Sequence, residues 1–340
     1  MTPKRLFFTV LVVLVLALTA GSVAQAAPVT IKIATVMPRF GPWATALARF
    51  AAAVKRLTKG QVNIKMYFGA VAGTEPRAIA RMKANQIQGV AVASVGLTRI
   101  ESSIRVIELP FLYRSFKEFR FVWRSMQPLF VKRFAAKGYR LLALASVGWV
   151  YVYSKHPVRG LADFARTKPW NWEHDPVAST ICRILGIRGH RLALTAVLPS
   201  LQTGVIDTVY AMPHAVQALQ WNTSISYMWN QRIAMAEAGI LIREDTFKQL
   251  TPEHQKIVIQ QGEKMQRYLN TESMRINKKA TAAMMANGLK RLEPSAGWKK
   301  RFKSIRRKIW DKLKNLMYRP DDLKKVQALL TLCRNTSCSS

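Results

Sequence analysis

Alternating and helical patterns of apolar residues divide the chain, from residue 29 onward, into strands and helices. Val29 to Val36 alternates as a strand does, and Val62 to Phe68 repeats that pattern. Apolar residues from Trp43 to Leu57 recur every three or four positions, which predicts an amphipathic helix. Thr74 to Asn85 predicts a second helix, and Val90 to Val95 a buried strand. This order of strand, helix, strand, helix, strand is typical of an α/β layer.

Longer patterns follow in the second half of this region and near the carboxyl end. Ser115 to Lys137 predicts a helix, with strands from Tyr139 to Val147 and from Trp149 to Ser154. Thr251, followed by Pro252 and Glu253, is a good helix start, and the pattern running to residue 287 predicts one long helix or two abutting ones. Residues 298–317 predict a basic helix, which we interpret as covering a domain rather than lying on a membrane.

Length and pattern together predict two lobes. Removing a 26-residue leader from 340 residues leaves 340 − 26 = 314, more than the roughly 250 to 300 residues at which single cores stop growing. Shorter α/β elements between residues 157 and 210 predict a second lobe of mixed character. The expected division is lobe I at 27–147 with a return segment at about 226–260, lobe II at 148–225 with carboxyl-terminal helices at about 261–320, and a tail at 321–340.

The leader has the order of a cleavable export signal. Lys4 and Arg5 precede an apolar run from Leu6 to Leu18, and small residues lead up to Ala26. The run is shorter than the roughly 20 residues that cross a bilayer, although an uncleaved anchor is the alternative. We predict cleavage after Ala26 and a periplasmic location.

The charge balance is strongly basic. The chain carries 53 Lys and Arg against 18 Asp and Glu, a formal net charge of +35. Because no zinc-finger, basic-zipper or aromatic RNA-binding signature accompanies the charge, we expect no nucleic-acid partner. Two interpretations stay open: attraction to anionic lipid or envelope polymer, and adaptation to an acidic periplasm, where few carboxylates means few groups to protonate.

Candidate reactive groups are sparse. Cys333 and Cys338 are able to close a small tail loop in an oxidising compartment, whereas Cys182 in an apolar stretch favours a buried, inert thiol. The histidines lack metal-ligand spacing, and no nucleophile elbow, phosphate loop or dinucleotide fingerprint is present. The sequence therefore predicts no enzyme activity, no metal and no cofactor.

Several segments together resemble the substrate-binding subunit of TRAP transporters, the DctP-like tripartite family. These are Ile31 to Pro38, Leu57 to Gly60 with the following strand, a "PFLY" segment within Glu108 to Tyr113, and Leu198 to Asp207. The resemblance covers nearly the whole chain after the leader. It implies an α/β, two-lobed periplasmic binding protein fold with hinge strands and a long lobe-spanning helix. It also implies a small-molecule ligand and membrane permease subunits as partners.

One departure from the family pattern bears on the ligand. Members that bind organic acids carry an arginine in the strand after the hinge, and here Trp170 takes that position. Arg166 or Lys168 is the alternative carboxylate clamp. The segment, together with a "LQW" sequence ending at Trp221, resembles a subgroup that works with a periplasmic tetratricopeptide-repeat protein. An indole in place of a guanidinium predicts an apolar or aromatic-bearing ligand.

Residues expected at strand ends or loop edges facing the cleft are the candidate ligand contacts, with core packing as the alternative for each. They are Phe40, Trp43, Trp149, Trp170, Trp172, Tyr210, Met212 and Trp221. The predicted function is capture of a small ligand between two closing lobes. A second hypothesis is a basic envelope protein that uses the same fold to bind anionic lipid or polymer.

Overall fold

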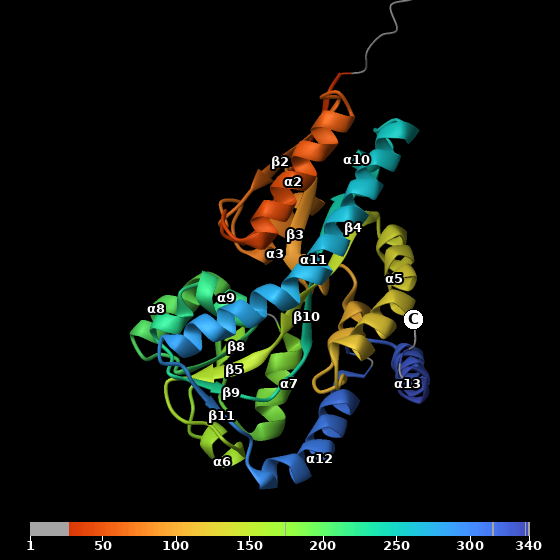
Figure 1. The fold of residues 1–340 in the computed structure, drawn as a ribbon. Coiled ribbons are helices and arrows are strands. Elements are labelled where there is room, and N and C mark those ends of the chain that lie inside the picture. Colours follow the sequence, from red (N-terminus) through yellow and green to blue (C-terminus); the bar gives the residue numbers. More distant parts are fainter. Residues whose placement is uncertain (1–26, 174, 315, 337, 339–340) are drawn as a thin grey trace, which may run out of the picture.

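A computed structural model describes residues 27–173, 175–314, 316–336 and 338 of the chain. The predicted export signal and its cleavage site therefore lie outside the described residues. Two larger sheets, each flanked by helices, form the centres of two lobes (Figure 1). The first sheet has the order β2-β1-β3-β10-β4. Its strands are β1 (Val29–Ala34), β2 (Val62–Tyr67), β3 (Gly89–Ala93), β4 (Tyr139–Trp149) and β10 (Met235–Arg243).

Strands β1, β2 and β3 are parallel, and β10 pairs antiparallel with both β3 and β4. Their connections bring apolar helix faces onto the sheet. The periodic residues Leu47, Phe50 and Val54 are almost fully buried in a cluster with sheet residues. The helices around this sheet are α2 (Pro42–Leu57), α3 (Glu75–Lys83), α4 (Ser94–Leu97), the 3₁₀ helix η1 (Ser102–Glu108), α5 (Phe116–Ala136) and α10 (Glu244–Lys248).

The second sheet has the order β11-β9-β5-β8, and a parallel β6-β7 pair lies beside it. Its strands are β5 (Tyr151–Ser154), β8 (Thr208–Ala211), β9 (Tyr227–Trp229) and β11 (Lys290–Leu292), with β6 (Trp170–Trp172) and β7 (His190–Leu192) as the pair. The helices here are α6 (Leu161–Phe164), α7 (Pro176–Leu185), η2 (Leu194–Ala196), α8 (Val197–Gln202), α9 (Pro213–Ala218) and η3 (Trp221–Thr223). The chain passes between the sheets through β4 into β5 and returns from β9 to β10.

A single helix, α11 (Pro252–Ala286), runs along both lobes (Figure 1). Its 35 residues span about 52 Å at 1.5 Å per residue. The helix begins as the sequence predicts, because the Thr251 hydroxyl accepts a hydrogen bond from the His254 N–H. It contacts β4 and α2 in the first lobe and α9 in the second. At Gly262 the helix lies so close to β4 that an added Cβ would stand 2.4 Å from the Leu142 carbonyl oxygen.

Polar side chains of α11 hydrogen-bond to the outer edge of β4, the strand that ends the first sheet. Gln266 accepts from the Leu144 N–H at 2.8 Å, and Asn270 accepts from the Ser146 N–H at 2.8 Å. Ser273 and Asn277 donate to the Ser146 and Val147 carbonyls at 2.6 and 2.7 Å. These four residues, 266, 270, 273 and 277, have the three- and four-residue spacing of one helix face.

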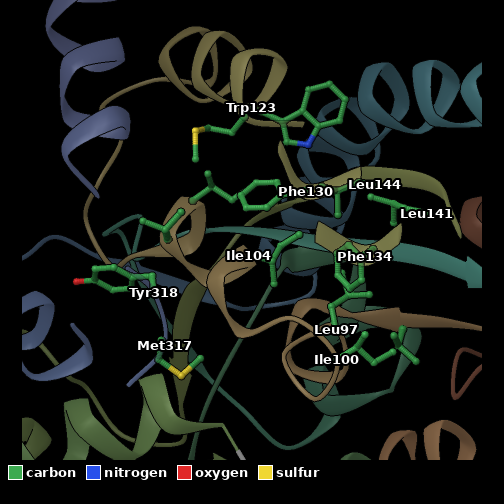
Figure 2. Close-up of a cluster of buried hydrophobic side chains, with 14 of the residues drawn as sticks. Leu97, Ile100, Ile104, Trp123, Phe130, Phe134, Leu141, Leu144, Met317 and Tyr318 are labelled. Carbon is green, nitrogen blue, oxygen red and sulfur yellow. The ribbon is translucent and has the colours of Figure 1, made fainter. Parts of the chain in front are cut away.

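The core under α5 is built from helix, sheet and carboxyl-terminal residues together, as Figure 2 shows. Phe130 and Phe134 lie near Leu144, and Met317 and Tyr318 reach the same cluster. Helix α12 (Ala296–Leu313) contacts α7, with Ile309 and Leu313 fully buried, so the basic helix covers the fold. Helix α13 (Pro320–Asn335) packs on α5, and a disulfide joins Cys333 to Cys338.

Candidate functional site

A cavity of about 310 Å³ lies where the two sheets meet. The first lobe contributes the loop after β1, the end of β3 and the beginning of β10, and the second contributes β6, β8, α7 and α9. Most of its walls are apolar, and its volume falls at the lower end of the roughly 300 to 1,000 Å³ of small-molecule sites. The cavity therefore has the size and position of a ligand site between lobes.

Stacked aromatic rings form the second-lobe wall. The ring of Trp170 stacks on Trp172 at 5.6 Å and on Tyr210 at 5.0 Å between centroids, and meets Trp221 edge to face at 5.3 Å. Its Nε1–H donates to the Leu192 carbonyl at 3.0 Å. Trp170 is only 2% exposed, so its indole mainly holds the wall together while the half-buried Trp172 and Tyr210 present more surface to the cavity.

Seven of the eight predicted contact residues line this cavity. They are Phe40, Trp43, Trp170, Trp172, Tyr210, Met212 and Trp221. Phe40 is 66% exposed at the rim, whereas Trp43 and Trp221 are buried side chains that face the cavity from within their lobes.

Trp149, at the end of β4, is the predicted contact that does not line the cavity. It is buried in the core under α5, with the Arg232 guanidinium 5.1 Å above its ring. Residues 147 and 149 would share a face in a regular strand, but the register shifts here, because Ala236 pairs with Gly148 and Glu237 with Ser146. The unpaired Val147 is therefore an extra residue in β4, and this irregularity lets Val147 line the cavity while Trp149 enters the core.

The alternative carboxylate clamps are also outside the cavity. Arg166 and Lys168 are both exposed, and neither lines it. The Lys168 ammonium instead donates to the Gly204 carbonyl at 3.3 Å, and its backbone N–H donates to Asp207 at 2.8 Å. Neither side chain reaches the cavity in this structure.

A buried ion pair connects the lobes at the cavity wall. Arg105 of η1 reaches Asp175, the residue that caps α7, with Nη2 3.1 Å from Oδ1. Its Nη1 lies 3.0 Å from Glu108 Oε2 and donates to the Ser94 hydroxyl at 2.9 Å. The Tyr210 hydroxyl in turn donates to Asp175 Oδ2 at 3.3 Å. Arg105 is thus held by two carboxylates, one from each lobe.

Two further carboxyls line the cavity with incomplete partners. Glu75 Oε1 accepts from the Ala93 N–H at 2.9 Å, but its Oε2 has no hydrogen-bond partner among the described residues. Burial raises the pKa of the Glu75 carboxyl to about 7. Glu237 is 1% exposed, and neither of its oxygens has a partner in the described part of the chain. Burial, with the Glu108 carboxyl nearby, raises the pKa of Glu237 well above its usual value.

Sequence reasoning missed these charged residues, although the sequence carried a signal for them. Arg105 and Glu108 interrupt a short apolar stretch, and Glu237 is a lone acid in an otherwise apolar strand. Ionisable residues are rarely fully buried unless paired or functional, so such interruptions mark candidates. The pattern around Cys182 predicts a buried thiol, but the residue is half-buried and lines the cavity.

Within the described residues, no group of His, Cys, Asp and Glu side chains is arranged to hold a metal ion. The same part of the chain contains no helix that is both long and apolar enough to cross a bilayer.

Two α/β lobes joined by exchanged strands, a helix lying along both and a cavity between them define a two-lobed periplasmic binding protein. The model of the DctP family, bacterial extracellular solute-binding protein family 7, matches residues 33–315. The chain belongs to this family. Because its members are binding proteins, the prediction that the chain is not an enzyme agrees with its family.

Solved structures share the fold at low sequence identity. An extracytoplasmic solute receptor of Bordetella pertussis that binds pyroglutamic acid is 18% identical, with a TM-score of 0.82 over 89% of this chain and 99% of that one. A TRAP periplasmic solute-binding protein of Xanthobacter autotrophicus with bound β-D-galacturonate is 19% identical, with a TM-score of 0.82 over 88% and 99% of the two chains. A Shewanella oneidensis relative with bound succinate is 16% identical, with a TM-score of 0.82 over 89% and 100%.

A curated relative gives a closer but partial sequence match. A solute-binding protein of Chromohalobacter salexigens is 28% identical over 174 residues, which is 51% of this chain. The match spans about half of that relative's length, 52%.

Proposed function

We propose that this protein captures a small, apolar or aromatic-bearing solute between its lobes and delivers it to the membrane permease of a TRAP-type transporter. The observation that carries the proposal is the cavity itself, about 310 Å³ of mostly apolar space with walls from both lobes. A ligand that touches both lobes favours their closed arrangement by its differential affinity for that state. Aromatic walls supply area and stacking for such a ligand.

The position of Arg105, the one Arg or Lys among the described residues of the cavity wall, supports an apolar ligand over an organic acid. Arg105 already faces Glu108 and Asp175 at 3.0 and 3.1 Å. A ligand carboxylate would have to compete with both for the guanidinium, in a cavity whose described walls hold no lysine. Trp170 lies in the strand where organic-acid binders of the family carry their arginine, which also favours an apolar ligand over an organic acid.

Further partners follow from the sequence resemblance. We infer export by cleavage after Ala26, and a periplasmic tetratricopeptide-repeat protein as a second partner beside the permease. Lobe boundaries near residues 147 and 225, with carboxyl-terminal helices completing the second lobe, belong to the same proposal. Co-purification of the tagged protein from its own envelope, with the partners identified by mass spectrometry, tests the partner assignments, and the intact mass of the purified protein tests the cleavage site.

Native mass spectrometry of protein purified from its own periplasm tests the ligand assignment. A retained apolar or aromatic-bearing molecule supports the proposal, and a retained dicarboxylate or uronate contradicts it. Thermal stabilisation by that molecule at both low and high salt separates a cavity ligand from anionic polymer, since polymer binding to a strongly basic protein fades with salt.

A further inference from the structure

The acidic lining of the cavity contrasts with the basic composition of the chain. Among the described residues of its wall, the carboxyls of Glu75, Glu108, Asp175 and Glu237 stand against the single guanidinium of Arg105. His214 also lines the cavity, but burial lowers the pKa of its imidazole, so it adds no positive charge at neutral pH. In a protein with 53 basic and 18 acidic residues, this local excess of carboxyls is an exception to the composition.

The network around Arg105 leaves little for a ligand anion to bind. Glu108 accepts from the Glu237 backbone N–H at 2.6 Å and also from the Ser94 hydroxyl. Asp175 accepts from the Val177 N–H at 3.0 Å, besides its pairing with Arg105. Arg105 and its two carboxylate partners together have a net charge of −1 when all three are ionised.

Glu237 is the group that this network does not satisfy. Both of its oxygens are buried and lack a hydrogen-bond partner within the described chain, although its backbone N–H is bound. A buried acceptor without a partner destabilises the fold, and more strongly when it is charged. The ionisable groups that act on it are Glu108 and Arg105 of η1, and Tyr113, whose own pKa rises through burial and the Glu237 charge. Arg105 is the one cation among these groups, and it already pairs with the carboxylates of Glu108 and Asp175.

We propose that the solute carries a protonated amine at one end, which pairs with Glu237 inside the cavity while an apolar body packs against the aromatic wall. This assignment rests on the proposed function and specifies its ligand class. An ammonium group donates three hydrogen bonds and supplies the missing positive charge. Glu237 is only 1% exposed, and at a buried site the attraction between opposite charges is stronger than in solvent.

A proton should leave the protein when such a ligand binds. Burial and the nearby Glu108 carboxyl raise the pKa of Glu237 and so favour its protonated form in the empty cavity, whereas a cation beside it favours the ionised form. Affinity for the amine therefore rises with pH until the pH exceeds the pKa of the empty site. Glu75, whose pKa is about 7, adds to the same direction if the amine also approaches it.

Three probes that share a phenylethyl body separate the polar end from the apolar one: phenethylamine, 2-phenylethanol and 3-phenylpropionate. The cavity is about twice the roughly 150 Å³ that accepts benzene in an engineered core, so all three fit. Isothermal titration calorimetry with wild type, Glu237→Gln and the exposed control Glu263→Gln measures each affinity. Repeating the amine titration in buffers of different ionisation enthalpy measures the released proton.

The expected result is at least tenfold tighter binding of phenethylamine than of the other two probes by wild type and Glu263→Gln. Glu237→Gln should lose that preference, keep its affinity for 2-phenylethanol and release no proton. Equal affinities for the three probes, or tighter binding of 3-phenylpropionate, would overturn the amine assignment. Either result would still agree with a ligand whose apolar body binds in the cavity. Failure of all three probes to bind would contradict the proposal of an apolar or aromatic-bearing ligand, and the amine assignment with it.

Discussion

Replacing Glu75 with glutamine removes a buried charge while keeping the shape of the side chain. The new amide would retain an oxygen acceptor for the Ala93 N–H, now 2.9 Å from Glu75 Oε1. Its nitrogen would take the place of Oε2, which has no hydrogen-bond partner among the described residues. The Glu75→Gln variant therefore resembles the protonated form of Glu75 at every pH.

The size of the effect follows from the raised pKa. The usual value is 4.5 and the folded value is about 7, a difference of 7 − 4.5 = 2.5. At about 1.4 kcal/mol for each pKa unit, ionised Glu75 destabilises the fold by on the order of 3 kcal/mol. Because the folded state holds the proton more tightly, this group's contribution is most favourable below pH 4.5 and is lost as pH rises to about 7.

Thermal unfolding at pH 5 and pH 7.5 measures this contribution. Wild type should lose about 2 kcal/mol between these values through Glu75, while Glu75→Gln should not, so the variant melts roughly 4 °C higher than wild type at pH 7.5 and nearly the same at pH 5. Glu263→Gln, which changes an exposed carboxyl on α11, should follow wild type at both pH values. Equal melting temperatures of Glu75→Gln and wild type at pH 7.5 would refute the reasoning.

Three other changes test the packing around the site. Gly262→Ala brings a Cβ within 2.4 Å of a β4 carbonyl oxygen and should lower the free energy of unfolding, measured in urea, by about 1–3 kcal/mol. The control Gly297→Ala has open space around it and should not lower stability. Equal effects of the two changes would contradict the close approach. Arg105→Met should lower the free energy of unfolding by about 3–5 kcal/mol. The double variant Arg105→Met/Asp175→Asn should lose less stability than the sum of the two single variants, and strict additivity would show that the two ions do not interact. Trp170→Arg should unfold at markedly lower urea concentration, because it buries a charge among stacked rings; unchanged stability with new dicarboxylate binding would show that the position faces the ligand directly.

Periodicity predicted the regular elements closely because strong local patterns and tertiary burial agree there. The helix predicted from Trp43 to Leu57 is α2, and the pattern from Thr251 to residue 287 is the single helix α11. Local pattern is weaker in the stretch between residues 157 and 210, where strand β8 begins only at Thr208. Gly204 adopts a positive φ of 75° and Val205 is exposed, so the chain turns there before it pairs.

The aromatic wall was predictable in part, whereas its charged neighbours were not. Trp172 and Tyr210 follow from strand ends facing a cleft, and both line it. The pairing of Arg105 with Asp175 joins residues 70 positions apart, across two lobes, and no local pattern encodes such a contact. The burial of Trp170 beneath its neighbours likewise depends on tertiary packing.

The hydrogen bonds from α11 to β4 have a consequence for how the chain matures after export. An outermost strand with free N–H and C=O groups is a template for pairing with another molecule. Here side chains between Gln266 and Asn277 occupy those groups. These residues follow β4 by more than 100 positions. A chain that is exported amino end first therefore exposes the free edge of β4 until residues 266–277 have also been exported. The risk of aggregation during export is therefore highest before α11 covers this edge. Changes to the side chains of Gln266, Asn270 and Asn277 should lower the yield of exported protein more than they lower its final stability.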